Sequence, residues 1–361
     1  MSTGSAGSHT RLHDMLRKCV ALNIPVQATL ELTYRCNLNC GHCYIDCKES
    51  DELTLDEWRQ VLDQLKAAGL LYILFTGGEI MVRRDFLDIA TYARRRGLFI
   101  SLLTNCTLVT PEMALAIAAL RPVSIGTSLY GASASTHESI TRVPGSFNKT
   151  VEGIKLLVQA GLVPRVQTVV MKSLAGELPK IKELAKEIGA ISSAQFGLAP
   201  SRSGSNYPSQ YELSEDEVLE SGLGLDFFGV CVEEGPGVCR AGKTQCSVSP
   251  SGDVFPCNLF PLKLGNIRES SFETIWRLEP CAELRYLRSM RRSDLHACQV
   301  CEVKAYCHRC TAVAFIETGR MDGPSPTACR WAQMRWRLTQ DAEVTQCQKK
   351  PTLNRKSLQK S

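Results

Sequence analysis

The stretch QATLELTYRCNLNCGHCY, residues 27–44, decides how the first half of the chain is expected to fold. Residues 27–33 are mostly apolar or β-prone, as in a short buried strand. Three cysteines follow with C-x3-C-x2-C spacing, namely Cys36, Cys40 and Cys43. The sequence therefore predicts a metal-binding loop at the carboxyl end of a first strand.

Further strand-like runs alternate with segments whose apolar residues recur at helical spacing. The predicted strands span residues 27–33, 71–76, 98–104, 123–129, 165–171 and 194–198, and the predicted helices span 54–68, 85–96, 111–120, 147–160 and 177–188. This alternation predicts parallel βα units of the α/β class, arranged as an open sheet or a partial barrel. In both arrangements the chemistry lies at the carboxyl ends of the strands.

The composition argues against several classes of protein. No apolar run approaches the roughly 18 residues of a membrane span, and the N-terminus lacks a signal-type hydrophobic segment. A cytoplasmic protein without membrane association is expected. The net charge of +5 comes from residues 348–361, which hold five basic residues and no acid, so nucleic-acid binding is not indicated. In such a chain, 17 cysteines indicate metal binding rather than disulfides.

A change in composition divides the chain. A Gly/Ser/Pro-rich stretch at 200–210 ends the βα pattern, and a turn-rich, cysteine-dense region begins after residue 225. We expect too little apolar core there for its size, so that metal clusters supply the missing cross-links. The expected divisions are an N-terminal extension (1–24), a first domain (25–225), a cysteine-rich domain (226–345) and a basic disordered tail (346–361).

A four-iron cluster binds one cysteine thiolate at each iron when it is fully ligated. The first group supplies only three cysteines. Three thiolates leave one iron without a protein ligand, and an open position is what distinguishes catalytic metal sites from closed structural ones. An open iron can chelate a small molecule through an amine and a carboxylate. A zinc knuckle, free thiols, and closure of the site by Cys47 are the alternatives.

Eight later cysteines provide two sets of four. They are Cys239, Cys246, Cys257, Cys298, Cys301, Cys307, Cys310 and Cys329. Two sets of four thiolates suit two fully ligated iron–sulfur clusters. By themselves these spacings suit structural zinc equally well.

The motif CNLNCGHCY after a strand resembles the signature of the radical S-adenosylmethionine (SAM) superfamily. FTGGE, residues 75–79, is similar to the glycine-rich motif of that family, although the family commonly continues with Pro where this chain has Ile80. The resemblance implies a partial (β/α)6 TIM-like barrel and a SAM-binding four-iron cluster on Cys36, Cys40 and Cys43. It also implies a set of SAM contacts: His42, Gly77, Gly78, Glu79, Asn105 and Ser128.

The later cysteines resemble the SPASM extension, a small domain with two auxiliary [4Fe–4S] clusters. The resemblance implies one cluster on Cys239, Cys246, Cys257 and Cys310, and a second on Cys298, Cys301, Cys307 and Cys329. The last spacing, between Cys307 and Cys310, is x2 where the family usually has x3.

This resemblance implies an oxidoreductase with SAM and three [4Fe–4S] clusters as cofactors. It would cleave SAM reductively to a 5′-deoxyadenosyl radical, with electrons from a flavodoxin- or ferredoxin-type protein. The expected substrate is a ribosomal peptide under maturation, by thioether or carbon–carbon cross-linking or a related oxidation. A haem or tetrapyrrole side chain is the alternative substrate. A non-catalytic iron–sulfur or zinc module is the alternative from another class.

Two features bear on the substrate. Sulfatase-maturating members carry an Asp base where this chain has Asn258, whose amide does not take up a proton at neutral pH, so formylglycine formation is disfavoured. About 25 residues precede the first predicted strand, which is too few for a peptide-recognition domain. A separate leader-recognition protein is therefore the expected partner of a peptide maturase.

Overall fold

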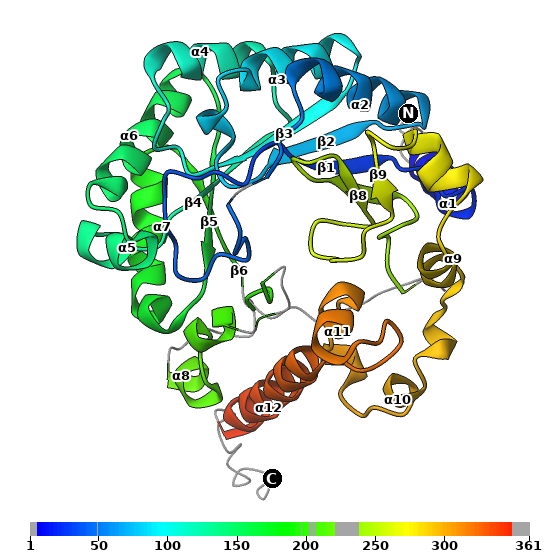
Figure 1. Cartoon of the computed structure of the whole chain (residues 1–361). Coiled ribbons are helices and arrows are strands. Elements are labelled where there is room, and N and C mark those ends of the chain that lie inside the picture. Colours follow the sequence, from blue (N-terminus) through cyan, green and yellow to red (C-terminus); the bar gives the residue numbers. More distant parts are fainter. Residues whose placement is uncertain are drawn as a thin grey trace, which may run out of the picture.

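The computed structural model describes residues 6–48, 50–195, 197–201, 205, 207–220 and 238–348. Six parallel strands form the main part of one sheet that curves into a partial barrel (Figure 1). They are β1 (Gln27–Glu31), β2 (Tyr72–Thr76), β3 (Phe99–Thr104), β4 (Ser124–Ser128), β5 (Arg165–Val169) and β6 (Ile191–Gln195). The expected α/β fold class is confirmed.

Helices cover the outer face of these strands in an arc (Figure 1). They are α2 (Leu55–Ala67), α3 (Phe86–Arg95), α4 (Pro111–Ala119), α5 (Ala134–Thr141), α6 (Ser146–Gln159) and α7 (Leu178–Glu187). Helix α2 starts at a capping box, in which Thr54 and Glu57 each accept a hydrogen bond from the other's backbone N–H. Trp58, Phe75 and Phe86 are fully buried between the helices and the sheet. Burial of each such aromatic contributes about 1.5–3 kcal/mol.

The strand register brings four sequence motifs to one edge of the sheet. Glu31 at the end of β1 pairs with Thr76 at the end of β2, and Thr104 of β3 pairs with Thr127 of β4. The cysteine loop, the Gly-Gly-Glu turn, Asn105 and Ser128 therefore follow or end neighbouring strands at their carboxyl ends, as the sequence predicted.

Three further strands extend the sheet beyond β1. Strand β7 (Gln245–Val248) pairs in parallel with β1, and β8 (Asp253–Phe255) and β9 (Gly265–Asn266) follow in antiparallel fashion. The first cysteine-rich segment is thus an extension of the barrel sheet. This pairing was not predicted.

The rest of the C-terminal region is helical. It contains α9 (Ala282–Ser289), α10 (His296–Gln299), α11 (Thr311–Thr318) and α12 (Pro326–Gln348), preceded by α8 (Glu215–Glu220) at the end of the barrel. A small apolar cluster that includes Phe260, Leu287 and Met290 packs against Cys257, Cys298 and Cys310. The thiols expected to bind metal are therefore part of the packing of this region.

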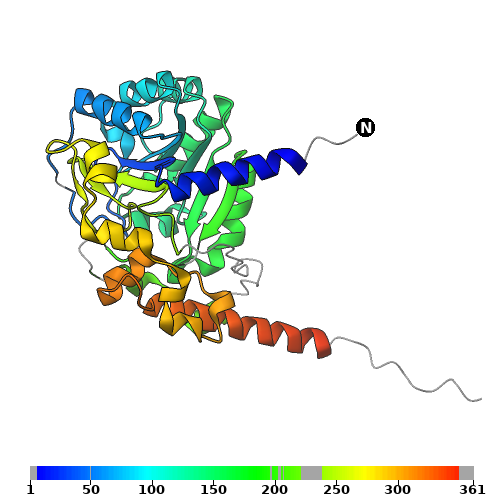
Figure 2. The same cartoon turned by 90° about the vertical axis from the view of Figure 1, so that its right-hand side faces the viewer.

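The remaining elements are short turns and one N-terminal helix. The turns are η1 (Ile80–Val82), η2 (Lys172–Glu177), η3 (Tyr207–Tyr211), the π-helical η5 (Thr274–Leu278), η6 (Arg292–Asp294) and η7 (Lys304–Tyr306). Helix α1 (Ala6–Ala21) projects away from the barrel, and α12 projects toward the same side (Figure 2). None of the helices in the described residues combines the length and apolar composition that crossing a bilayer requires.

Some predicted boundaries differ from the structure. Strand β6 lies at Ile191–Gln195, three residues before the predicted run at 194–198. Helix α5 was not predicted, and α12 continues to Gln348, past the expected division at residue 345.

Candidate functional site

The loop that carries Cys36, Cys40 and Cys43 is held to both neighbouring elements. On one side, Gly78 N donates to Thr33 O at 2.7 Å and Glu79 N donates to Arg35 O at 2.9 Å. On the other side, two backbone N–H groups of the loop donate to carbonyl groups at the end of α5, at 3.0 and 3.1 Å. The three cysteines are thus presented by a loop with fixed backbone geometry.

Arg83 joins the two ends of this loop. Its buried Nη1 donates to Leu32 O at 3.1 Å and to Leu53 O at 3.0 Å. Its Nη2 forms an ion pair with Asp85 at 2.7 Å. The sequence analysis did not single out Arg83. Both of its loop partners are backbone carbonyl groups, and they lie 51 and 30 residues away along the chain.

The two glycines of the Gly-Gly-Glu motif allow this close contact. Gly77 has φ +143°, and a Cβ atom there would lie 2.1 Å from Thr33 O. A Cβ atom on Gly78 would lie 2.3 Å from Arg35 O. Only glycine permits such an approach. In the structure, the glycines therefore meet the backbone of the cysteine loop.

The three thiols are close enough to influence one another. Burial raises the pKa of all three thiols, Cys36, Cys40 and Cys43, and that of Cys40 rises to about 12. Negative charge on Cys36 or Cys43 raises the pKa of Cys40 further, whereas Lys48 lowers it. A cationic cluster would compensate for the burial of these thiolates.

Three cysteine thiols in one loop are the donor type that holds a four-iron cluster. Among the described residues, no three His, Cys, Asp or Glu side chains gather closely enough to hold one metal ion. A four-iron cube spreads its cysteines, because each thiolate binds a different iron.

Glu79 is buried beside the cysteine loop and accepts three hydrogen bonds. Its Oε1 accepts from Thr104 Oγ1 at 2.8 Å and from Met81 N at 3.0 Å, and its Oε2 accepts from Asn105 N at 2.6 Å. Burial raises its pKa, and these donors oppose that shift. Asn105 Nδ2 lies 3.9 Å from Cys36 Sγ, so both predicted SAM contacts lie next to the first cysteine.

His42 lies against Tyr130, which follows the carboxyl end of β4. The His42 Nε2 atom is 3.1 Å from Tyr130 Oη, and their rings meet edge to face at 4.7 Å. In the part of the chain that is described, His42 Nδ1 is buried and has no hydrogen-bond partner. Burial lowers the pKa of His42 to about 4, which keeps the ring neutral.

Tyr130 connects several predicted site residues, although the sequence analysis did not select it. Burial raises its pKa, and negative charge on Cys40, Cys43 or Cys36 adds to this shift. Ser128 forms a side-chain hydrogen bond with it. The only sequence signal was its place two residues after Ser128, in the run TSLYG at residues 127–131.

A second tyrosine links the first cysteine loop to the C-terminal region. Tyr44, next to Cys43, donates a hydrogen bond to the buried Glu31 Oε1 at 2.9 Å. Asn258, next to Cys257, donates to the Tyr44 hydroxyl. Burial raises the pKa of Tyr44, and Glu31 adds to this effect.

Seven of the eight later cysteines form two groups. Negative charge on Cys239 or Cys310 raises the pKa of Cys257 after the effect of burial, so these three lie together. Burial raises the pKa of Cys307 to about 11, and Cys329, Cys298 and Cys301 add to it. Each group matches the set that the resemblance implied, except for one residue.

That residue is Cys246 on β7. It is fully buried and belongs to the main apolar core, together with Ala28 and Val248. Its Sγ lies 3.9 Å from Gln27 O, and burial alone accounts for its raised pKa. Cys246 thus packs in the main core, whereas Cys257 and Cys310 pack against the separate apolar cluster that includes Phe260.

Two family models match the chain. The radical SAM superfamily model covers residues 30–186, and the model of an iron-sulfur cluster-binding domain, SPASM, covers residues 239–302. The AdoMet-dependent heme synthase of Methanosarcina barkeri is 32% identical over 331 residues, which span 82% of this chain and 94% of the synthase. This chain belongs to the radical SAM superfamily. It is a radical SAM enzyme with a SPASM domain, and its cofactors are SAM and [4Fe–4S] clusters.

Other relatives of this radical SAM enzyme include a maturase. Mycofactocin maturase MftC of Mycolicibacterium smegmatis is 30% identical, over 84% of this chain and 83% of the maturase. The crystal structure of Streptococcus suis SuiB bound to S-adenosylmethionine has a TM-score of 0.69 and 16% identity, covering 91% of this chain and 83% of SuiB. At that identity the likeness shows the fold alone.

Proposed function

We propose that this enzyme cleaves SAM reductively and removes a hydrogen atom from a ribosomal peptide that is being matured. The supporting observation is the cysteine loop at the end of β1, whose three neighbouring thiols lie beside Glu79 and Asn105. When bound, the cluster supplies one electron to SAM, which yields methionine and the 5′-deoxyadenosyl radical that takes the hydrogen.

In this proposal, Cys36, Cys40 and Cys43 hold the cluster and leave one iron for SAM. His42, Gly77, Gly78, Glu79, Asn105 and Ser128 contact SAM. The buried His42 Nδ1, which lacks a partner among the described residues, supports its assignment. Leaving such an atom unsatisfied costs about 1–3 kcal/mol, and a hydrogen bond from a bound nucleoside would remove this cost.

The two later groups of cysteines hold the auxiliary clusters. Cys298, Cys301, Cys307 and Cys329 hold one, and Cys239, Cys257 and Cys310 contribute to the other. Electrons reach the enzyme from a flavodoxin- or ferredoxin-type protein. A separate leader-recognition protein presents the peptide.

The peptide class is supported by the relatives. MftC is named a maturase, and a structure of SuiB is described as bound to the precursor peptide SuiA. The reaction would form a thioether or carbon–carbon cross-link, or a related oxidation product. Haem or another tetrapyrrole is the second candidate substrate, because the 32% identity to the heme synthase extends over 94% of that protein.

Anaerobic reconstitution tests the proposal. The reconstituted enzyme should hold about twelve irons, four for each cluster, and release 5′-deoxyadenosine with SAM and dithionite. Cys40→Ala should remove about four irons and stop this release, whereas Cys47→Ser, at an exposed cysteine of the same loop, should change neither. Bound zinc without SAM cleavage would contradict the proposal and favour a structural module.

The substrate class is tested in the same assay. A candidate precursor peptide should stimulate 5′-deoxyadenosine release and gain a modified mass, and haem precursors should do neither. The reverse pattern would establish the tetrapyrrole instead.

A further inference from the structure

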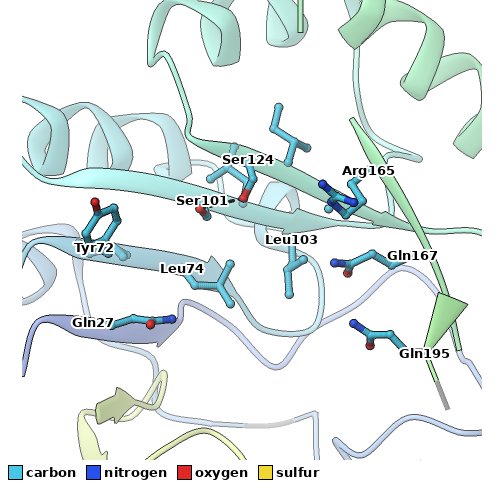
Figure 3. Close-up of a pocket in the computed structure, with 13 residues that line it drawn as sticks. Gln27, Tyr72, Leu74, Ser101, Leu103, Ser124, Arg165, Gln167 and Gln195 are labelled. Carbon is cyan, nitrogen blue, oxygen red and sulfur yellow. Dashed lines mark hydrogen bonds between the residues drawn. The ribbon is translucent and has the colours of Figure 1, made fainter. Parts of the chain in front are cut away.

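A cavity of about 460 Å3 lies on the concave side of the parallel strands (Figure 3). Its volume is within the range of about 300–1,000 Å3 that is common for ligand sites. Gln27 of β1, Gln167 of β5 and Gln195 of β6 point toward one another across it (Figure 3). The residues proposed to hold the clusters or SAM do not line it. The cavity therefore lies inside the barrel on the amino-terminal side of the proposed SAM site.

The lining combines apolar and polar surfaces. Tyr72, Leu74 and Leu103 provide the apolar part (Figure 3). The polar part consists of the three glutamine amides, of Ser101 and Ser124, which are hydrogen-bonded to each other at 2.9 Å, and of Arg165. A ligand with an apolar or planar body and a polar group fits such a lining.

Arg165 is the one charged side chain among the described residues that line the cavity. Within the described chain, its guanidinium forms neither a hydrogen bond nor an ion pair. A guanidinium has five N–H donors in a planar fork that matches a carboxylate. The positive charge and the nearby amide donors favour an anionic oxygen ligand, and the lining offers no acid that would repel one.

The strand register places this charge close to the reaction site. Arg165 pairs with Gly126, and Gln167 pairs with Ser128, the proposed SAM contact at the end of β4. Paired residues point to the same face of a sheet. Since a strand rises about 3.3 Å per residue, Arg165 lies one layer, or about 7 Å, below the level of Ser128. A molecule bound at Arg165 would extend toward the place where the radical is formed.

We propose that Arg165, with Gln167 and Gln195, binds a carboxylate of the substrate inside the barrel. The apolar lining holds the adjoining part of the substrate, and the atom that loses hydrogen lies toward Ser128. This inference rests on the proposed function and adds a property of the substrate, a carboxylate near the reacting carbon. A peptide carboxylate and a tetrapyrrole propionate both supply this group.

Binding to the reconstituted enzyme, without turnover, tests the inference. One pair of probes is haem and its dimethyl ester, followed by the Soret band. The other is a fluorescein-labelled hexapeptide with a free C-terminal carboxylate and the same peptide with a terminal amide, followed by anisotropy. In the wild type, the carboxylate form of one pair should bind roughly 10- to 100-fold more tightly than its neutral form, the effect of one charged hydrogen-bonded pair.

Arg165→Gln should abolish this preference, and Arg165→Lys should retain part of it. Arg95→Gln is the matched control, because it removes the same charge from an arginine of α3 that is also exposed but does not line the cavity, and it should keep the preference in full. The pair that shows the preference identifies the source of the carboxylate. Absence of a preference from both wild-type pairs, or its persistence in Arg165→Gln, would overturn the inference.

Two readouts keep this test separate from the proposed function. Arg165→Gln should retain the wild-type iron content and the substrate-independent release of 5′-deoxyadenosine, since Arg165 is not among the proposed cluster or SAM ligands. Failure of the wild type to release 5′-deoxyadenosine would count against the proposed function, whereas the binding preference is measured without SAM cleavage.

Discussion

The substitution Gly77→Ala tests how the barrel holds its cysteine loop. The new Cβ atom would lie 2.1 Å from Thr33 O, whereas ordinary contacts begin at 3.4 Å. The two backbones must separate by about 1.3 Å to relieve this overlap. Such a shift would break the 2.7 Å hydrogen bond from Gly78 N to Thr33 O.

The expected loss in the free energy of unfolding follows from these contacts. The conformation of Gly77, with φ +143°, costs a residue with a Cβ about 1–3 kcal/mol. The lost hydrogen bond adds about 1 kcal/mol. We therefore expect a loss of about 3 kcal/mol in urea unfolding, and a displaced Cys36 that leaves the reconstituted protein about four irons short.

Gly97→Ala is the matched control. Gly97 also has a positive φ, +74°, but a Cβ atom there would meet nothing within 4 Å. Only the backbone strain of about 1–2 kcal/mol applies, and the iron content should not change. Equal stability and equal iron content of the two variants would refute the idea that the glycine contact positions the cysteine loop.

Three further outcomes are expected. Cys257→Ala should lower the iron content by about four, whereas Cys246→Ala should retain all of it and lose only core stability; a loss of four irons from Cys246→Ala would restore it as a ligand. Tyr130→Phe removes the partner of His42 Nε2, so the free energy of unfolding should fall by about 1 kcal/mol and SAM should bind more weakly in equilibrium dialysis; unchanged affinity would argue against this support. A hydrogen bond from Arg268, and then one from Thr54, lowers the pKa of Glu57 from 4.5 to about 2. Ionised Glu57 therefore stabilises the fold fully above about pH 4.5, and this contribution is lost as the pH falls toward 2. The stability difference between wild type and Arg268→Ala, about 1 kcal/mol for a partly exposed pair, should shrink as the pH falls from 5 to 3; a constant difference would contradict this assignment.

Most of the barrel was predictable, because its strands are short apolar runs between helices with clear starts. The exception, β6, has β5 as its one neighbour in the described sheet. Ser192 and Ser193 interrupt the apolar pattern of β6. Its position is set instead by pairing with β5, and the first pair is Ile191 with Arg165. Helix α5 carries the polar sequence ASTHESIT, which offers little apolar periodicity, and only the Ser133 cap marks its start.

The candidate site was predictable where its residues are close in sequence. Cys36, Cys40 and Cys43 share one loop, so their spacing alone indicated a cluster. Tyr130 reaches His42 across a separation of 88 residues, which periodicity does not reveal.

The grouping of Cys246 with three other thiols was carried over from the family resemblance. Pairing of β7 with β1, opposite Ala28, places Cys246 in the core instead. That contact joins segments far apart in the sequence, since Cys246 and Gln27 are separated by 219 residues. Only the folded chain reveals it.

The central claim concerns the iron that Cys36, Cys40 and Cys43 leave open. Electron paramagnetic resonance of the dithionite-reduced enzyme, recorded before and after adding SAM, tests it most directly. The account predicts that SAM changes the spectrum of this cluster, and that Cys47→Ser responds as the wild type does. The account would be contradicted if SAM left the wild-type spectrum unchanged while the Cys47→Ser substitution itself changed that spectrum. This result would show that Cys47 closes the site.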